Sequence, residues 1–130
     1  MAPDSYRVLV IDDDANMRSL LKLLLEHRGH RTLLASDSEV GLVLAEGGQP
    51  HLILLDVAMP RRNGLDVYLD LQNHPLTAGI PVLVCSAALT QPEVEIWRRL
   101  PHVVEVITKP FGVDALLARV EAVCLGRIAP

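Results

Sequence analysis

The chain has 130 residues, of which 50% are hydrophobic, and its formal net charge is −4 at pH 7. This length and hydrophobic content fit one ordinary domain with its own core, so we expect residues 1–130 to form a single domain. The longest basic stretches are the pairs Arg61–Arg62 and Arg98–Arg99, which argues against direct nucleic-acid binding. No apolar run approaches the roughly 20 residues that a membrane helix needs.

The cysteines and the N-terminal residues bear on the compartment. Cys85 lies inside an apolar run and Cys124 near the C-terminus, and neither belongs to a CxxC pair or a cluster with metal-ligand spacing. The N-terminal residues lack the basic flank and apolar core of a signal peptide. We therefore expect a cytoplasmic protein in a reducing compartment, with no membrane contact.

Five short runs rich in Val, Ile and Leu are spaced along the chain, and each predicts a β-strand. They cover Arg7 to Ile11, Arg31 to Ala35, Leu52 to Leu55, Pro81 to Cys85 and Val103 to Ile107. Only one Trp, one Phe and two Tyr occur, so the core must consist mainly of aliphatic side chains. That composition suits buried parallel strands flanked by helices.

Stretches of helical period follow the predicted strands. Apolar residues at i, i+3 and i+4 spacing between Met17 and Leu25 predict the first helix, and Gly29 is expected to end it. Four later helices are expected at Ser38 to Ala45, Leu65 to Asn73, Glu93 to Leu100 and Val113 to Cys124. Such regular alternation predicts an α/β domain, a doubly wound five-stranded parallel sheet with helices on both faces.

Polar residues stand at the ends of four predicted strands. Asp12–Asp14 follow the first strand, Asp56 the third, Ser86 the fourth, and Thr108 with Lys109 the fifth. The carboxyl ends of parallel strands meet at the edge where such folds bind ligands. Carboxylates gathered there would raise one another's pKa unless a cation lies among them, so we expect a divalent ion. All-oxygen ligation favours Mg2+, with Mn2+ as an alternative, whereas zinc would prefer His or Cys.

Each polar strand end has an expected chemical role. Asp56 is the predicted nucleophile toward phosphorus, since a metal ion and Lys109 would neutralise charge on the transferring group. Ser86 would then hydrogen-bond the new phosphoryl group. Asp14 is expected to be the N-cap of the first helix and not part of the site.

These residues resemble the receiver domains of two-component response regulators from Tyr6 to Cys124. Val8–Asp14 resembles the family's first strand and acidic pair, and Leu54–Pro60 with Gly64 resembles its phosphoacceptor segment. Ser86–Ala87 and Lys109–Phe111 complete the resemblance. The resemblance implies a flavodoxin-like sheet with strand order 2-1-3-4-5, five helices and a core over 6–124.

The resemblance also implies roles at the strand ends. Asp13 and Asp56 would bind the metal directly, Asp12 would help through water, and the carbonyl of Ala58 would be another ligand. Asp56 would take the phosphoryl group from a phosphohistidine on a sensor histidine kinase or histidine phosphotransfer protein. Water would later remove it, so the domain would act only on itself and would not be an enzyme for other substrates. Its output would be altered binding of a downstream protein target.

The fifth predicted strand departs from the family's usual pattern in two ways. Val106 stands three residues before Lys109, where the family usually has an aromatic side chain that moves on activation. Val104–Glu105–Val106 also lacks the acidic-acidic-aromatic pattern of the family's transcriptional dimers, so we expect a monomer or a weak homodimer.

Trp97 is expected to be packed inside, and most of the five histidines to be solvated.

Three alternatives compete with this hypothesis. A haloacid-dehalogenase-like phosphatase needs a second acid two residues after its nucleophile, where this chain has Ala58. A flavin or nucleotide carrier would want a glycine-rich loop after the first strand, where three aspartates would repel phosphate. The strongest alternative is a non-switching receiver, a pseudo-receiver that serves as a constitutive protein-interaction module, because the usual aromatic is missing at Val106.

Overall fold

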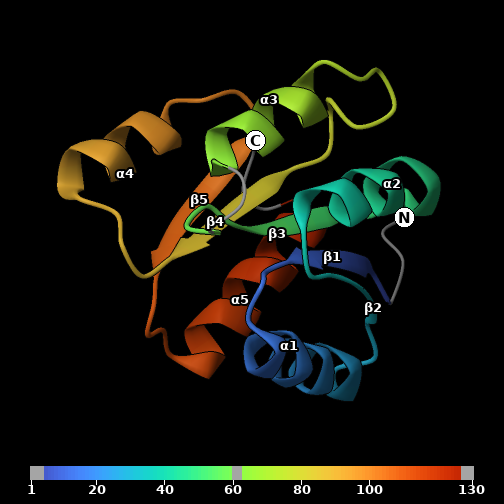
Figure 1. Ribbon diagram of the computed structural model, residues 1–130. Coiled ribbons are helices and arrows are strands. Elements are labelled where there is room, and N and C mark those ends of the chain that lie inside the picture. The colour runs from blue at the N-terminus through green and yellow to red at the C-terminus, as the bar shows by residue number, and fades with distance from the viewer. Residues whose placement is uncertain (1–4, 60–62, 127–130) are drawn as a thin grey trace.

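The computed structural model of the chain describes residues 5–59 and 63–126, in which strands and helices alternate (Figure 1). The strands are β1 (Arg7–Ile11), β2 (Arg31–Ala35), β3 (Leu52–Asp56), β4 (Val82–Ser86) and β5 (Val103–Thr108). The helices are α1 (Ala15–His27), α2 (Ser38–Gly48), α3 (Gly64–Gln72), α4 (Gln91–Arg98) and α5 (Val113–Cys124).

The five strands form one parallel sheet in the order β2-β1-β3-β4-β5. This order and the five helices confirm the predicted doubly wound, flavodoxin-like α/β fold. The register pairs Ile11 with Leu55, Asp56 with Cys85 and Ser86 with Thr108. The carboxyl ends of β1, β3, β4 and β5 therefore reach the same edge of the sheet.

Helices cover both faces of the sheet, α2, α3 and α4 on one side and α1 and α5 on the other (Figure 1). Successive residues of each strand point to opposite faces of the sheet. Leu9 and Ile53 pack toward α2 and α3, whereas Val10 and Leu54 pack toward α1 and α5. All five residues of β3 and of β4 are buried. The aliphatic strands predicted from the sequence thus form a core on each face of the sheet.

Three strands end one residue later than the sequence predicts. β3 includes Asp56, β4 includes Ser86 and β5 includes Thr108, because each of these polar residues still pairs across the ladder. β4 also begins at Val82 and not at Pro81, which lacks the N–H that a ladder requires. Asp56 and Ser86 are thereby fixed by sheet hydrogen bonding and are not loop residues.

Helix ends follow local capping chemistry. α4 begins at Gln91, two residues earlier than predicted, because Thr90 and Glu93 form a reciprocal capping box, and it ends at Arg98, two residues earlier than predicted. The side chain of Asp14 accepts the N–H groups of Asn16 and Met17, which confirms it as the N-cap of α1. Gly29 follows the end of α1 at a φ of 87°, where glycine adapts best.

The predictions for Trp97 and for most of the histidines agree with the structure. Trp97 is buried and contacts the ring of Tyr68 edge-on at 5.7 Å between ring centroids, as expected. His27 is exposed and His51, His74 and His102 are partly exposed, in agreement with the expectation that most histidines are solvated, whereas His30 is buried. His30 is 5% exposed and its Nδ1 accepts the N–H of Tyr6. Within residues 5–59 and 63–126, no helix is long and apolar enough to span a bilayer.

Candidate functional site

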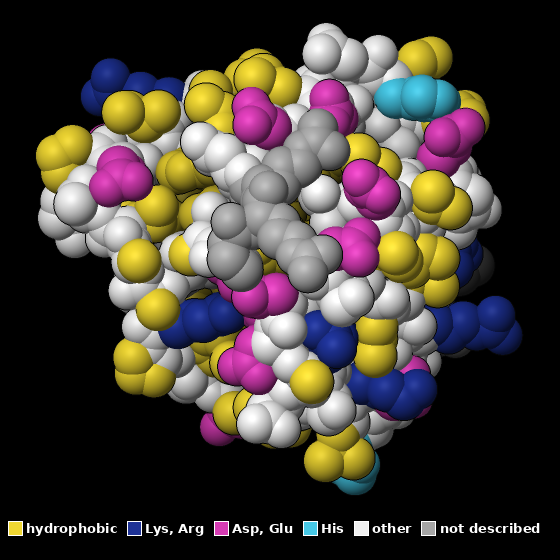
Figure 2. Space-filling model, viewed as in Figure 1, with side chains coloured by type: hydrophobic (Ala, Val, Ile, Leu, Met, Phe, Trp, Pro, Cys, Tyr) yellow, Lys and Arg dark blue, Asp and Glu magenta, His cyan; other side chains and the backbone are white. Residues whose placement is uncertain are grey.

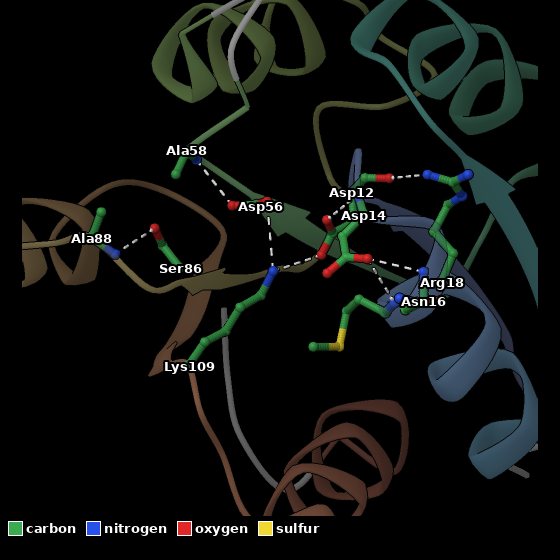
Figure 3. A network of polar contacts seen from close by, with 10 residues as sticks. Asp12, Asp14, Asn16, Arg18, Asp56, Ala58, Ser86, Ala88 and Lys109 are labelled. Atoms are coloured by element: carbon green, nitrogen blue, oxygen red, sulfur yellow. Dashed lines mark hydrogen bonds and ion pairs between the residues drawn. The ribbon is translucent and has the colours of Figure 1, made fainter.

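Four of the predicted side chains meet at the carboxyl edge of the sheet, those of Asp12, Asp13, Asp56 and Lys109. Figure 3 shows three of them, Asp12, Asp56 and Lys109, pointing toward one another. Single carboxylate oxygens of Asp12, Asp13 and Asp56 all lie within 4.8 Å of one another. Lys109 Nζ donates to Asp12 Oδ2 at 2.7 Å and lies 3.5 Å from Asp56 Oδ2. Strand ends that are far apart in the sequence thus bring three acids and one base together.

Asp12 is buried and anchors this cluster from the end of β1. Its Oδ1 accepts the backbone N–H of Asp14 at 2.9 Å, while its Oδ2 accepts from Lys109. Arg18 on α1 donates through Nη1 to the backbone carbonyl of Asp12 at 2.8 Å. Sequence reasoning missed Arg18, because a contact between a helix side chain and a main-chain carbonyl leaves no motif in the sequence.

Asp56 is 6% exposed and is held at the last position of β3. Its Oδ1 accepts the N–H of Ala58 at 3.0 Å, which fixes the direction of the carboxylate. Burial raises the pKa of Asp56, and the negative charge of Asp12 adds to this effect, whereas the Ala58 N–H and the charge of Lys109 oppose it. Burial alone would lower the pKa of Lys109, but its hydrogen bond to Asp12 and the nearby acids outweigh burial and raise it.

Ser86 lies fully buried at the end of β4, next to Asp56 on the neighbouring strand β3. Its Oγ accepts the N–H of Ala88 at 3.3 Å, and its carbonyl accepts the N–H of Lys109 at 3.0 Å. Ser86 therefore connects the β4–α4 loop to Lys109. Among the described residues, Lys109 carries the only amine at this edge of the sheet. A serine hydroxyl both donates and accepts, so its proton stays free to serve an oxygen ligand.

The donor set fits a hard divalent cation. Asp12 and Asp56 are buried while Asp13 is exposed, so the cluster has one solvent-facing side for an ion that keeps several waters. The three aspartates offer carboxylate oxygens only, which is the chemistry that magnesium prefers over zinc. The predicted fourth ligand, the Ala58 carbonyl, belongs to the residue whose N–H already holds Asp56.

Val106 is 6% exposed and lies in the same apolar cluster as Trp97 of α4. Its side chain has no ring to rotate and no hydroxyl to bond Ser86. Trp97 is the aromatic ring that comes closest to the role of the missing aromatic, and it packs against Tyr68. The Tyr68 hydroxyl donates to the carbonyl of Pro101 at 2.6 Å. The described residues on this side of the sheet therefore present a packed α3–α4 contact in place of an exposed aromatic on β5.

The cysteine beside the site is expected to be chemically inert in the folded protein. Cys85 is 5% exposed and burial raises the pKa of its thiol to about 12, whereas partial burial, with the charge of Glu121, raises the pKa of Cys124 to about 11. Only the thiolate is reactive, so a thiol reagent should label Cys124 slowly and Cys85 only after unfolding. Mass spectrometry in native and in urea buffer checks this, with Cys124→Ser as the control. Rapid labelling of that variant without urea would contradict the packing of β4.

Comparison with known proteins agrees with this geometry. A sequence model described as the response regulator receiver domain matches residues 8–121. The chain is 39% identical over 116 residues to RpaA, a DNA-binding dual master transcriptional regulator of Synechocystis, covering 89% of this chain and 48% of RpaA. It is 30% identical over 120 residues to protein PilH of Pseudomonas aeruginosa, covering 92% of this chain and 98% of PilH.

The chain thus spans about half the length of RpaA but nearly all of PilH. Among solved structures, the receiver domain of the Francisella response regulator 1452 superposes with a TM-score of 0.84 at 26% identity, covering 94% of this chain and 98% of that one. The sequence match extends over almost the entire sheet and includes every strand end that carries a site residue. The chain therefore belongs to the response regulator receiver domain family.

Proposed function

We propose that this receiver domain takes a phosphoryl group onto Asp56 and thereby changes which protein it binds. The observation that carries the proposal is the buried Asp56 carboxylate, oriented by the Ala58 N–H, with Lys109 Nζ 3.5 Å away and two further carboxylates beside it. The donor is a phosphohistidine on a sensor histidine kinase or a histidine phosphotransfer protein. The domain is a cytoplasmic protein, and it is a monomer or a weak homodimer.

Each residue of the site has its own role in this transfer. Asp12, Asp13 and Asp56, with the Ala58 carbonyl, would hold Mg2+ or Mn2+, which would neutralise charge on the phosphoryl oxygens. Asp56 supplies the attacking carboxylate oxygen, and Lys109 balances charge on the group it receives. Ser86 donates its hydroxyl to the phosphorylated aspartate. Water later removes the group, so the domain promotes its own phosphorylation and dephosphorylation only.

Phosphorylation adds charge next to two structural connections. A phosphoryl group brings roughly two negative charges and three acceptor oxygens, so it competes with Asp12 for Lys109 and draws toward itself the Ser86 hydroxyl, whose Oγ accepts the Ala88 N–H. A change at either contact moves the β4–α4 loop or the start of the β5–α5 loop. Since Val106 offers no rotating ring, we infer that output passes through these loops and α4.

The test is incubation with Mg2+ and acetyl phosphate, followed by intact-mass measurement. We expect one added phosphoryl group, which disappears in Asp56→Asn and with a chelator, while the exposed-carboxylate control Asp114→Asn still adds it. Addition that persists in Asp56→Asn would move the acceptor to another residue. If Mg2+ binds but no phosphoryl group is added, the chain is the non-switching interaction module that Val106 favours.

A further inference from the structure

Exposed apolar and acidic side chains share the outer surface of α2 and α3. We define the α2–α3 face by five exposed residues, Glu39, Val43 and Glu46 on α2 and Asp66 and Leu69 on α3. Val43 is 69% and Leu69 45% exposed, which is high for side chains that gain free energy by burial. None of these residues has a role in the proposed phosphoryl transfer.

A groove runs between the two helices within this face. It has a volume of about 130 Å³ and is lined by Leu42, Glu46, Asp70, His74 and Thr77. The Thr77 hydroxyl that lines the groove already has a hydrogen-bond partner, because it donates to the carbonyl of Leu71 at 2.6 Å. On its rim, His74 Nε2 lies 3.4 Å from Glu46 Oε1, and both side chains remain about half exposed. A partner side chain can therefore enter the groove without leaving a buried polar group unpaired.

The charged side chains of the five residues that define this face are all carboxylates. Residues 32–59 and 63–97 contain no Lys or Arg, and they include the whole of α2 and α3. Figure 2 shows acidic and hydrophobic side chains alternating over these two helices, with the basic side chains lying over other parts of the same view. Arg61 and Arg62 fall outside the described residues. Among the described residues, the face offers carboxylates and apolar contacts to a partner and no cation.

We propose that the α2–α3 face docks a basic, amphipathic helix of a partner protein. Such a helix presents apolar side chains at i, i+3 and i+4 spacing to Val43, Leu69 and the groove, with Lys or Arg on its flanks against Glu39, Glu46 and Asp66. An anionic membrane or nucleic acid would be repelled by the same carboxylates. Two copies of the chain related by a twofold axis would set this acidic face against itself.

The proposal is tested on the full, unphosphorylated chain with a synthetic leucine–lysine peptide patterned at helical period. A peptide of the same composition patterned at period two is the control ligand. Affinity is measured by fluorescence anisotropy at physiological ionic strength, and amide chemical shifts locate the contact. We expect the helical peptide to bind more tightly than the control peptide and to shift amides of α2 and α3.

Matched variants distinguish binding at the α2–α3 face from attraction to the protein's overall negative charge. Glu39→Lys with Asp66→Lys should weaken binding at least about tenfold, whereas Glu95→Lys with Asp114→Lys makes the same change in net charge elsewhere and should cost less than about twofold. Val43→Ser with Leu69→Ser should weaken binding about fivefold, whereas Leu20→Ser with Leu23→Ser on α1, on the other side of the sheet, should not.

Four results would overturn the proposal. Equal losses in both charge-reversal pairs would show attraction to the protein's overall charge. Amide shifts confined to α1, α4 or α5 would place the contact on another surface. A failure to bind below about 1 mM would leave the face without this partner class. Self-association of the chain that Val43→Ser with Leu69→Ser abolishes would assign the face to a second copy.

Discussion

Replacing Gly64 with alanine is expected to destabilise the native state by about 3 kcal/mol, at the upper end of the cost of overpacking. Gly64 is the buried first residue of α3, and a Cβ added there would overlap the Cα and Cβ of Val57. A clash with backbone cannot be relieved by rotating a side chain, so the segment after β3 has to move. That segment carries the Ala58 N–H that orients Asp56.

The same substitution should therefore reduce phosphoryl transfer as well as stability. Urea unfolding measures the first effect and phosphoryl incorporation from acetyl phosphate with Mg2+ measures the second. Gly47→Ala is the matched control, since Gly47 lies in α2 and its added Cβ meets nothing within 4 Å. Alanine should leave that variant as stable as the parent or slightly more stable. If Gly64→Ala unfolds at the same urea concentration as Gly47→Ala, the close approach of α3 to Val57 is wrong.

The sequence predicted the fold well because its signals were regular. Five aliphatic runs alternating with helical periods leave few topologies for a short chain, since crossovers between parallel strands are right-handed. The site was predictable for the same reason: residues at strand ends share one edge, so Asp12, Asp56 and Lys109 had to lie near one another. Asp14 was separable from them because a carboxylate just before a helical period is an N-cap.

The remaining features depend on tertiary contacts that no local pattern records. β5 is irregular where it meets β4, with Val82 opposite Val103 but Leu83 opposite Glu105. That shift lets both Val103 and Val106 pack toward α4, which a strict period of two would forbid. The contact of Arg18 with the Asp12 carbonyl and the burial of His30 likewise arise only when distant segments meet.

Asp56→Asn is expected to stabilise the metal-free protein by about 1–2 kcal/mol at neutral pH. Asparagine keeps an oxygen for the Ala58 N–H but removes one of three carboxylates that lie within 4.8 Å of one another. At an effective dielectric constant of about 20, Asp12 and Asp13, each roughly 5 Å away, repel Asp56 by about 3 kcal/mol apiece, and Lys109 at 3.5 Å attracts it by about 5 kcal/mol. The net gain is the part of the repulsion that Lys109 leaves uncompensated.

The pH dependence of this gain follows from the direction of the pKa shift. The pKa of folded Asp56 is raised above its ordinary value of 3.8, so the unfolded carboxyl ionises first as pH rises. Folded wild-type protein holds the extra proton in that interval and loses stability as pH climbs through it, until the folded carboxyl ionises too. The stabilising effect of Asp56→Asn should therefore be absent well below pH 3.8 and constant above the folded pKa.

Urea unfolding with a chelator, repeated with Mg2+, checks both statements. Mg2+ should stabilise the wild-type protein by mass action and close the gap to Asp56→Asn, which has lost a ligand. Asp13→Asn is the control inside the cluster, and its gain should be smaller because Asp13 is exposed and water screens its charge. Lower stability of Asp56→Asn than of wild type in chelator would mean that Lys109 overcompensates the acids, and that the metal-free cluster holds the strand ends together instead of straining them.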